Sequence, residues 1–294
     1  MERKNFYSKV LLFGEYGIIS NSNALSVPFK EFYGFLNKST KLNQDQKHSN
    51  DELIELYHFI YKNSTINDII DIQNLKKDIE LGLYFDSNIP IESGVGSSGA
   101  LVASIFHKYS RIDVNNLEIM EIKNLLSIIE SKFHGKSSGL DPLVSFYSKP
   151  ISLSNQKIKL LDDIDYRDYR IYLINSNINA STKEMIEMFN MKMKDTDFNT
   201  FFNNDFISKT NVCIDNFLNN SSSFQDSIKD LSEITFNNFQ EMIPNQIKEK
   251  WEYGLNTNSY FMKLCGSGGG GFFTVFNFED QLSSNLSGFK SFQV

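Results

Sequence analysis

Three short glycine-containing segments, far apart in the chain, most constrain how this sequence can fold. They are Lys9-Val-Leu-Leu-Phe-Gly-Glu15, Pro90-Ile-Glu-Ser-Gly-Val-Gly-Ser-Ser-Gly-Ala100 and Lys263-Leu-Cys-Gly-Ser-Gly-Gly-Gly-Gly271. Glycine lets a backbone turn sharply and approach other groups closely, so each segment predicts a tight loop beside a regular element. The apolar run before the first Gly-Glu pair predicts a buried strand over residues 10–13.

The spacing of apolar residues predicts a strand-rich first half and a helix-rich second half. Strands are expected over residues 10–13, 24–36, 79–85, 168–176, 261–264 and 271–276. Helices are expected over 51–61, 100–109, 117–133 and much of 182–255, with a break near 219–223. The polar residues 37–50 predict a surface loop. This order of elements is typical of an α+β protein.

The length and charge of the chain limit its class. A chain of 294 residues is long enough for two domains, which we expect over residues 1–165 and 166–294. The net charge of −7 argues against a nucleic-acid partner. No apolar run reaches the roughly 18 residues of a membrane span, and the N-terminus has no apolar signal region. Cys213 and Cys265 lack the spacing of a metal-binding or redox-active pair of cysteines. We therefore expect a reducing environment and a cytoplasmic protein.

The segment Gly94-Val-Gly-Ser-Ser-Gly99 has the form G-x-G-x-x-G. A dinucleotide site would need a repeating βαβ pattern and an acidic residue about 20 positions on, whereas Asp113 lies nearer. The alternative is a phosphate site, because glycines bring the backbone close to an anion and the following helix directs free N–H groups at it. A plain turn is the third possibility. The chain lacks the G-x-x-x-x-G-K-[ST] pattern and the protein-kinase signatures.

Three charged residues are candidates for chemistry. Asp141 lies in a predicted tight loop, where a carboxylate can take a proton from a substrate hydroxyl. Glu130 borders the apolar face of a predicted helix, where a carboxylate needs a cation, and Mg²⁺ would suit. Lys9 precedes the first predicted strand. From the residues alone, simpler structural roles stay open as alternatives: Asp141 as a turn residue, Glu130 as a salt-bridge partner and Lys9 as a surface residue.

The three segments, in this order, resemble the motifs of the GHMP kinase superfamily, and most closely those of its mevalonate kinases. Lys9 to Glu15 resembles K-[IVL]-x-L-x-G-E, and Lys263 to Gly271 resembles K-L-[TC]-G-[AS]-G-G-G-G. The stretch Glu130 to Asp141 resembles E-x-x-x-H-G-x-P-S-G-[VI]-D with the same spacing, and Ser181-Thr182-Lys183 resembles S-T-[KR]. The resemblance implies a two-lobe α+β GHMP kinase fold. Its N-terminal domain would be like ribosomal protein S5 domain 2, and its C-terminal domain ferredoxin-like.

The resemblance also implies roles for residues. Asp141 would be the catalytic base, with Lys9 beside it, while Ser98 and Glu130 would ligate Mg²⁺. The ATP phosphates would be held by the loop and helix start formed by Gly94, Val95, Gly96, Ser97, Ser98, Gly99 and Ala100. The acceptor side would be lined or supported by Glu15, Tyr16, Thr182, Gly266, Ser267 and Gly268.

The implied activity is ATP- and Mg²⁺-dependent phosphorylation of a small-molecule alcohol, with mevalonate the expected acceptor in isoprenoid precursor synthesis. Another GHMP kinase, of the phosphomevalonate or homoserine kinase type, stays an alternative, and so does a non-catalytic GHMP-fold protein that binds a ligand. The expected partner is the alcohol substrate. We expect no nucleic acid or membrane partner and keep a homodimer open.

The chain departs from the family pattern at several positions. Phe-Tyr-Ser stands before Lys9 in place of Ala-Pro-Gly, and Tyr16 stands where mevalonate kinases commonly carry His, although phosphomevalonate kinases often have Tyr. The remaining departures are Gly99 for Ala, Ser137 for Pro, Leu140 for Val or Ile, and Ala180 for a basic residue. None of these departures changes the residues expected to act as the base or to bind the metal. They bear on the identity of the acceptor and on how its carboxylate is held.

Overall fold

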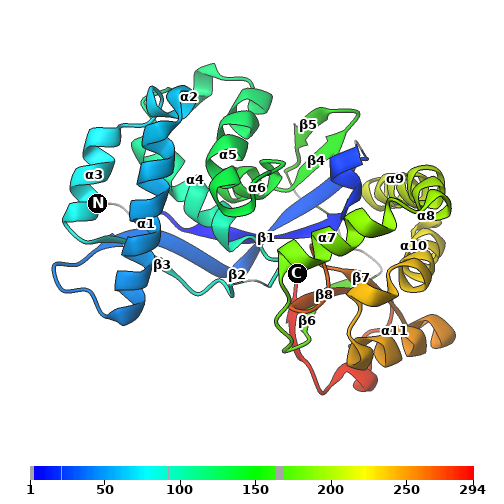
Figure 1. Cartoon of the computed structure of the whole chain (residues 1–294). Coiled ribbons are helices and arrows are strands. Elements are labelled where there is room, and N and C mark those ends of the chain that lie inside the picture. Colours follow the sequence, from blue (N-terminus) through cyan, green and yellow to red (C-terminus); the bar gives the residue numbers. More distant parts are fainter. Residues whose placement is uncertain (1–2, 21, 92, 163, 165–168) are drawn as a thin grey trace. The chain divides into compact units, whose positions relative to one another are not determined.

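The computed structural model describes residues 3–20, 22–91, 93–162, 164 and 169–294 (Figure 1). The chain forms two compact units built from interleaved segments. The first comprises Met1–Lys9, Pro28–Pro90 and Gly96–Lys149, and the second comprises Val10–Val27, Ile91–Val95 and Pro150–Val294. The predicted domain ranges, 1–165 and 166–294, remain a prediction.

The first unit contains most of the helices of the first half of the chain. They are α1 (Gln44–Lys62), α2 (Ser64–Asn67), α3 (Ile72–Glu80), α4 (Ser97–Tyr109), α5 (Ile119–His134) and α6 (Leu140–Tyr147), with a short 3₁₀ turn at Val114–Asn116. Helix α4 packs against α5 and α6 (Figure 1), and its residues from Gly99 to Phe106 are all buried. The buried helix predicted over 100–109 is therefore confirmed.

Local capping explains where α1 begins. The Asn43 side chain accepts a hydrogen bond from the backbone N–H of Gln46, and the Gln46 side chain accepts one from the backbone N–H of Asn43. This capping box satisfies N–H groups that lack partners within the helix. The surface loop predicted over 37–50 is therefore wrong from Gln44 onward, because its polar residues start a helix.

Strands β1 (Phe6–Phe13) and β2 (Ala24–Lys38) contribute residues to both units. They belong to a sheet of order β1-β2-β4-β5, in which β3 (Leu83–Ser87) also pairs with β2. In the first unit, β3 lies antiparallel to residues 34–38 of β2. The strand predicted over 79–85 is wrong at its start, since α3 continues to Glu80 and Gly82 turns the chain with φ +81°. The strands predicted over 10–13 and 24–36 are confirmed.

A short hairpin in the second unit extends this sheet. Residues 24–26 of β2 pair antiparallel with β4 (Ile151–Ser154), which pairs antiparallel with β5 (Lys157–Leu160). The two turn residues, Asn155 and Gln156, have φ of +49° and +61°. Positive φ at both central positions matches the twist of a two-residue hairpin.

The second sheet, also in the second unit, is antiparallel and has the order β7-β8-β6-β9. Its strands are β6 (Arg170–Asn175), β7 (Tyr260–Leu264), β8 (Phe272–Asn277) and β9 (Lys290–Gln293). Strands β6, β7 and β8 confirm those predicted over 168–176, 261–264 and 271–276, although residue 168 lies outside the described residues. Every side chain of β7 and β8 is buried.

The second unit also contains most of the helices of the second half of the chain. They are α7 (Thr182–Lys192), α8 (Thr196–Phe201), a π-helical turn (Phe202–Phe206), α9 (Ile207–Leu218), α10 (Phe224–Asn238) and α11 (Asn245–Thr257), with 3₁₀ turns at Gly17–Ser20, Gln240–Met242 and Ser284–Leu286. Helices α10 and α11 pack on β7 (Figure 1), and the buried Trp251 donates to the Ser232 hydroxyl at 2.8 Å. Within the described residues, no helix is long and apolar enough to cross a membrane.

Candidate active site

The first unit brings Lys9 and Asp141 together. The Nζ atom of Lys9 lies 2.9 Å from Oδ2 of Asp141, and the lysine side chain is 5% exposed whereas the aspartate side chain is 30% exposed. Lys9 lies inside β1 rather than before it, so the interpretation as a surface lysine is wrong. Asp141 lies in the first turn of α6 rather than in a loop, because Gly139, with φ +73°, caps that helix. A buried cation therefore lies beside a carboxylate that solvent can reach.

The start of α4 lies against the same lysine. Gly96 precedes the helix in a left-handed conformation with φ +81°, and a Cβ atom there would lie 2.9 Å from Cγ of Lys9. The aliphatic part of Lys9 therefore occupies space that a side chain at position 96 would need. Because glycine has no side chain to cap the helix, the first N–H groups of α4 remain suited to an anion.

Glu130 is held by two serine hydroxyls. Ser98 Oγ donates to Glu130 Oε1 at 3.2 Å, and Ser137 Oγ donates to Glu130 Oε2. Burial, followed by the negative charge of Asp141, raises the pKa of Glu130 above its ordinary value, although the hydrogen bond from Ser137 and the charge of Lys9 act in the opposite direction. A cation close to this buried carboxylate would favour its charged form.

The donor set at Glu130 suits Mg²⁺ rather than a metal held by the protein alone. Ser98 and Glu130 supply oxygen ligands, which Mg²⁺ prefers, and Mg²⁺ usually binds through one or two carboxylates together with substrate phosphates. In the described part of the chain, no group of three or more His, Cys, Asp or Glu residues is placed to hold a metal. The residues therefore fit a magnesium ion that also binds a phosphate.

In the second unit, two glycine motifs that are far apart in the sequence meet. A Cβ atom at Gly94 would lie 2.6 Å from the carbonyl oxygen of Cys265, and one at Gly271 would lie 2.8 Å from the carbonyl oxygen of Ser93. Gly94 and Gly271 both have positive φ. Only glycine allows two backbones to approach this closely in this conformation.

Tyr16 ties the turn after β1 to the last glycine segment. Its hydroxyl donates to the carbonyl oxygen of Ser267 at 2.6 Å, and its ring stacks on Phe189 with a centroid distance of 4.4 Å. Tyr16 is buried, and burial together with the charge of Glu15 raises its pKa. The phenol is therefore a neutral hydrogen-bond donor within the second unit.

Glu15 forms a buried ion pair. Its Oε2 atom lies 2.6 Å from Nζ of Lys263 in β7, and both residues are buried. The Lys263 ammonium also lies 5.5 Å from the centre of the Phe13 ring. This pair connects the first and last motifs within the second unit. The predicted role of Glu15 and Tyr16 in lining the acceptor pocket stays a prediction.

The remaining predicted acceptor residues belong to the second unit as well. Thr182 is exposed at the first position of α7, which Ser181 caps by accepting from the N–H of Glu184. Gly268 has φ +70°, and a Cβ atom there would lie 2.9 Å from the carbonyl oxygen of Met242. A side chain at position 268 would therefore collide with the backbone of Met242.

The structure therefore groups the predicted residues by unit. The first unit holds Lys9, Asp141, Glu130 and residues 96–100 of the predicted phosphate loop. The second holds Gly94, Val95 and the residues predicted to bind the acceptor. Sequence reasoning noted Ser137 and Lys263 as motif positions but missed their bonds to carboxylates. The only signal was position, since Ser137 follows Glu130 by seven residues.

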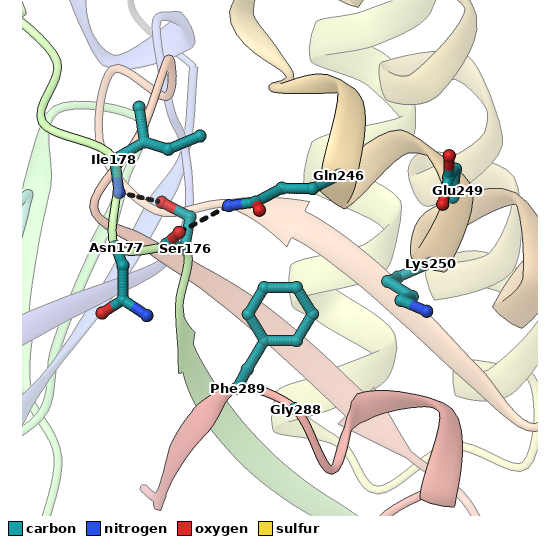
Figure 2. Close-up of a pocket in the computed structure, with 8 residues that line it drawn as sticks. All are labelled: Ser176, Asn177, Ile178, Gln246, Glu249, Lys250, Gly288 and Phe289. Carbon is teal, nitrogen blue, oxygen red and sulfur yellow. Dashed lines mark hydrogen bonds between the residues drawn. The ribbon is translucent and has the colours of Figure 1, made fainter.

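A separate pocket of about 450 Å³ lies in the second unit (Figure 2). It is lined by Ser176, Asn177, Ile178, Gln246, Glu249, Lys250, Gly288 and Phe289. Figure 2 shows the Gln246 amide directed at Ser176, whose carbonyl oxygen it binds at 2.5 Å. None of the predicted site residues lines this pocket, so it is distinct from the candidate residues above.

Known proteins resemble this chain in sequence and in fold. Residues 48–149 match the GHMP kinases N-terminal domain. The chain is 27% identical over 169 residues to a mevalonate kinase of Methanocaldococcus jannaschii, and the match covers 52% of this chain and 54% of that relative. The chain therefore aligns with about half the length of this curated relative.

Two solved structures share the fold across nearly the whole chain. The mevalonate kinase of L. major in complex with R-mevalonate matches with a TM-score of 0.58 and 18% identity, covering 98% of this chain and 89% of that one. The phosphomevalonate kinase of Streptococcus pneumoniae, in complex with phosphomevalonate and AMPPNP, matches with a TM-score of 0.65 and 13% identity, covering all of both chains. The predicted α+β fold with two sheets is thus confirmed as the fold of these kinases, and residues 48–149 carry the match to the GHMP kinases N-terminal domain.

Proposed function

We propose that this protein is an ATP- and Mg²⁺-dependent kinase that phosphorylates the hydroxyl group of a small alcohol, with mevalonate as the acceptor. The observation that carries the proposal is the grouping of Lys9, Asp141 and Glu130 beside the start of α4 in one compact unit. Phosphoryl transfer depends mainly on positioned charge rather than on covalent chemistry with the protein. A base, a cation and an anion-binding helix end are the parts that such a reaction needs.

Each residue has a defined task in this proposal. Asp141 accepts the proton of the acceptor hydroxyl, since its carboxylate is partly exposed. Lys9 stabilises negative charge on the alcohol oxygen because its ammonium is fixed 2.9 Å from Asp141. The N–H groups at the start of α4 bind phosphate. Ser98 and Glu130 would hold Mg²⁺, which when bound neutralises charge on the transferred phosphoryl group.

The choice of mevalonate rests on the motif pattern and on the relative from M. jannaschii. Phosphomevalonate is the second candidate acceptor, because Tyr16 follows Glu15 as it often does in phosphomevalonate kinases. The similarity to solved structures does not separate the two, since both kinds of kinase share this fold. We propose that Glu15, Tyr16, Thr182 and the segment 266–268 contribute to acceptor recognition.

The test is ADP release by the purified protein with Mg²⁺-ATP, comparing mevalonate, phosphomevalonate, homoserine and galactose. Saturable turnover with mevalonate and much weaker turnover with the other three is the expected result. Turnover with phosphomevalonate alone would make phosphomevalonate the acceptor in place of mevalonate and leave the proposed class of reaction unchanged. Absence of turnover with all four, while ATP binds, would contradict the proposed reaction and favour a ligand-binding role.

A further inference from the structure

The hydroxyl of Ser137 is fixed between the Glu130 carboxylate and the start of α6. It donates its proton to Glu130 Oε2 and accepts the backbone N–H of Gly139 at 2.9 Å. Because a hydroxyl has a single proton, this pair of bonds determines its orientation. The backbone of Ser137 is held too, since its carbonyl oxygen accepts a hydrogen bond from Ser127 Oγ at 2.6 Å.

The two oxygens of Glu130 are therefore oriented by two different segments. Ser98, in the first turn of α4, bonds Oε1, and Ser137, in the segment before α6, bonds Oε2. Glu130 is 4% exposed, so little water reaches a carboxylate that has lost one of these donors. Gly139 caps the helix that carries Asp141, which connects the orientation of Glu130 to the segment that presents the base.

We propose that Ser137 is a positioning residue that orients the Glu130 carboxylate for Mg²⁺ bound with a nucleotide. This inference rests on the proposed function. Groups that hydrogen-bond a metal ligand fix its orientation, and their loss typically costs about 10–100-fold in metal affinity. The family pattern has proline at this position, which lacks a hydroxyl. The hydroxyl that bonds Glu130 at this position is therefore a feature of this chain and not of the family pattern.

The test is Mg²⁺ binding in the presence of AMPPNP, a nucleotide that is not turned over, measured by titration calorimetry on the full chain. Ser137→Ala should raise the Mg²⁺ concentration for half-saturation about 10-fold or more. Ser137→Thr keeps the hydroxyl and should stay close to wild type. AMPPNP affinity in EDTA should be the same for all variants, because the hydroxyl acts through the metal ligand.

Ser131→Ala is the matched control. Ser131 neighbours Glu130 on α5, but its hydroxyl donates to the carbonyl oxygen of Ile128 within the same helix at 2.7 Å. It should leave Mg²⁺ binding unchanged. If Ser137→Ala does not fold, Ser137→Pro gives the same test, because the family pattern accommodates proline there.

The outcomes separate the two proposals. One outcome is that Mg²⁺ tightens AMPPNP binding to the same extent in wild type and in Ser137→Ala. That result would overturn the role of Ser137 and leave the proposed function standing. Wild-type AMPPNP binding that does not respond to Mg²⁺ would overturn the metal site of the proposed function, and the role of Ser137 with it. A loss in Ser137→Ala that threonine restores supports the inference.

Discussion

The Nζ atom of Lys9 lies 2.9 Å from Oδ2 of Asp141, and only the aspartate side chain is substantially exposed, at 30%. The lysine is fixed from two sides, by this carboxylate and by Gly96, against which its aliphatic part packs. A charge that is held in place before the reaction stabilises developing negative charge without a reorganisation cost. In the proposed function, this arrangement would let Asp141 take the proton of the substrate hydroxyl while Lys9 stays fixed beside it.

Replacing Lys9 by methionine should lower kcat about 100-fold, because one fixed charge beside the reacting oxygen is lost. Methionine keeps most of the packing against Gly96. Nucleotide affinity in EDTA should change little, and steady-state kinetics together with calorimetry measure both quantities. Lys76→Met is the control, since Lys76 is exposed and lies 3.9 Å from Glu80 on α3. Equal kcat in the two variants would exclude Lys9 from the reaction.

Gly99 sets how closely α6 approaches α4. A Cβ atom at position 99 would lie 2.9 Å from both the carbonyl carbon of Asp141 and the nitrogen of Pro142, so the start of α6 must shift if Gly99 becomes alanine. Displacing a catalytic group by about 1 Å can cost about 100-fold in rate. We expect Gly99→Ala to lower kcat at least about 10-fold, with overpacking that costs about 1–3 kcal/mol of stability.

Gly288→Ala is the control for Gly99→Ala, because a Cβ atom at Gly288 meets nothing within 4 Å. Kinetics and urea denaturation of both variants give the comparison. A Gly99→Ala variant with wild-type kcat would show that the α4–α6 contact does not position Asp141.

Apolar periodicity and glycine motifs predicted a large part of this structure. Helix α4 and strands β7 and β8 follow from apolar runs, because continuous burial leaves a clear pattern. The hairpin β4-β5 was missed, since its strands have four residues each and its turn is Asn155-Gln156 rather than a glycine turn. The glycines before Asp141 predict a loop, but Gly139 caps a helix and Asp141 lies in its first turn.

The bonds within the candidate site were less predictable than the residues. The motifs named Lys9, Glu130 and Asp141, but no pattern in the sequence shows that Ser137 donates to Glu130. Glu15 and Lys263 are 248 positions apart, so their ion pair depends on the tertiary fold. Local rules concern neighbours along the chain, and such contacts lie beyond their range.

The buried pair of Glu15 and Lys263 should stabilise the second unit. Removing one partner of a buried ion pair leaves a charge without compensation and typically costs about 3 kcal/mol. Lys263→Met and Glu15→Gln should each lower the free energy of unfolding by about that amount. The double variant should lose less than the sum, with a coupling energy of about 1–3 kcal/mol.

Urea denaturation of wild type, the two single variants and the double variant gives the four free energies of this double-mutant cycle. Strictly additive losses would mean that Glu15 and Lys263 do not interact energetically, despite the 2.6 Å separation of their charged atoms.

Asp78 should make the stability of the first unit depend on acid pH. Partial burial acts to raise its pKa, but hydrogen bonds from Lys38, Tyr109 and Lys108 outweigh it and lower the pKa to about 2. Because the folded pKa is below the ordinary value near 3.9, this stabilisation is fully present above that value and is lost as the pH falls through about 2.

Asp78→Asn should therefore be less stable than wild type at pH 7. The difference should shrink between pH 4 and pH 2, because there the Asp78 carboxyl is protonated in the unfolded chain while it is still largely ionised in the folded protein. Thermal melts across this range measure the difference. A gap between the two proteins that stays constant down to pH 2 would show that the Asp78 charge does not contribute.

The most direct test of the account is turnover of mevalonate by Asp141→Asn with Mg²⁺-ATP, measured beside AMPPNP affinity. Asparagine keeps the shape of the side chain but cannot accept the proton, so we expect wild type to turn over and the variant to lose about 100-fold or more in kcat. AMPPNP affinity should remain that of wild type, because the base acts in the transition state. An Asp141→Asn variant that phosphorylates mevalonate at nearly the wild-type rate would contradict the account.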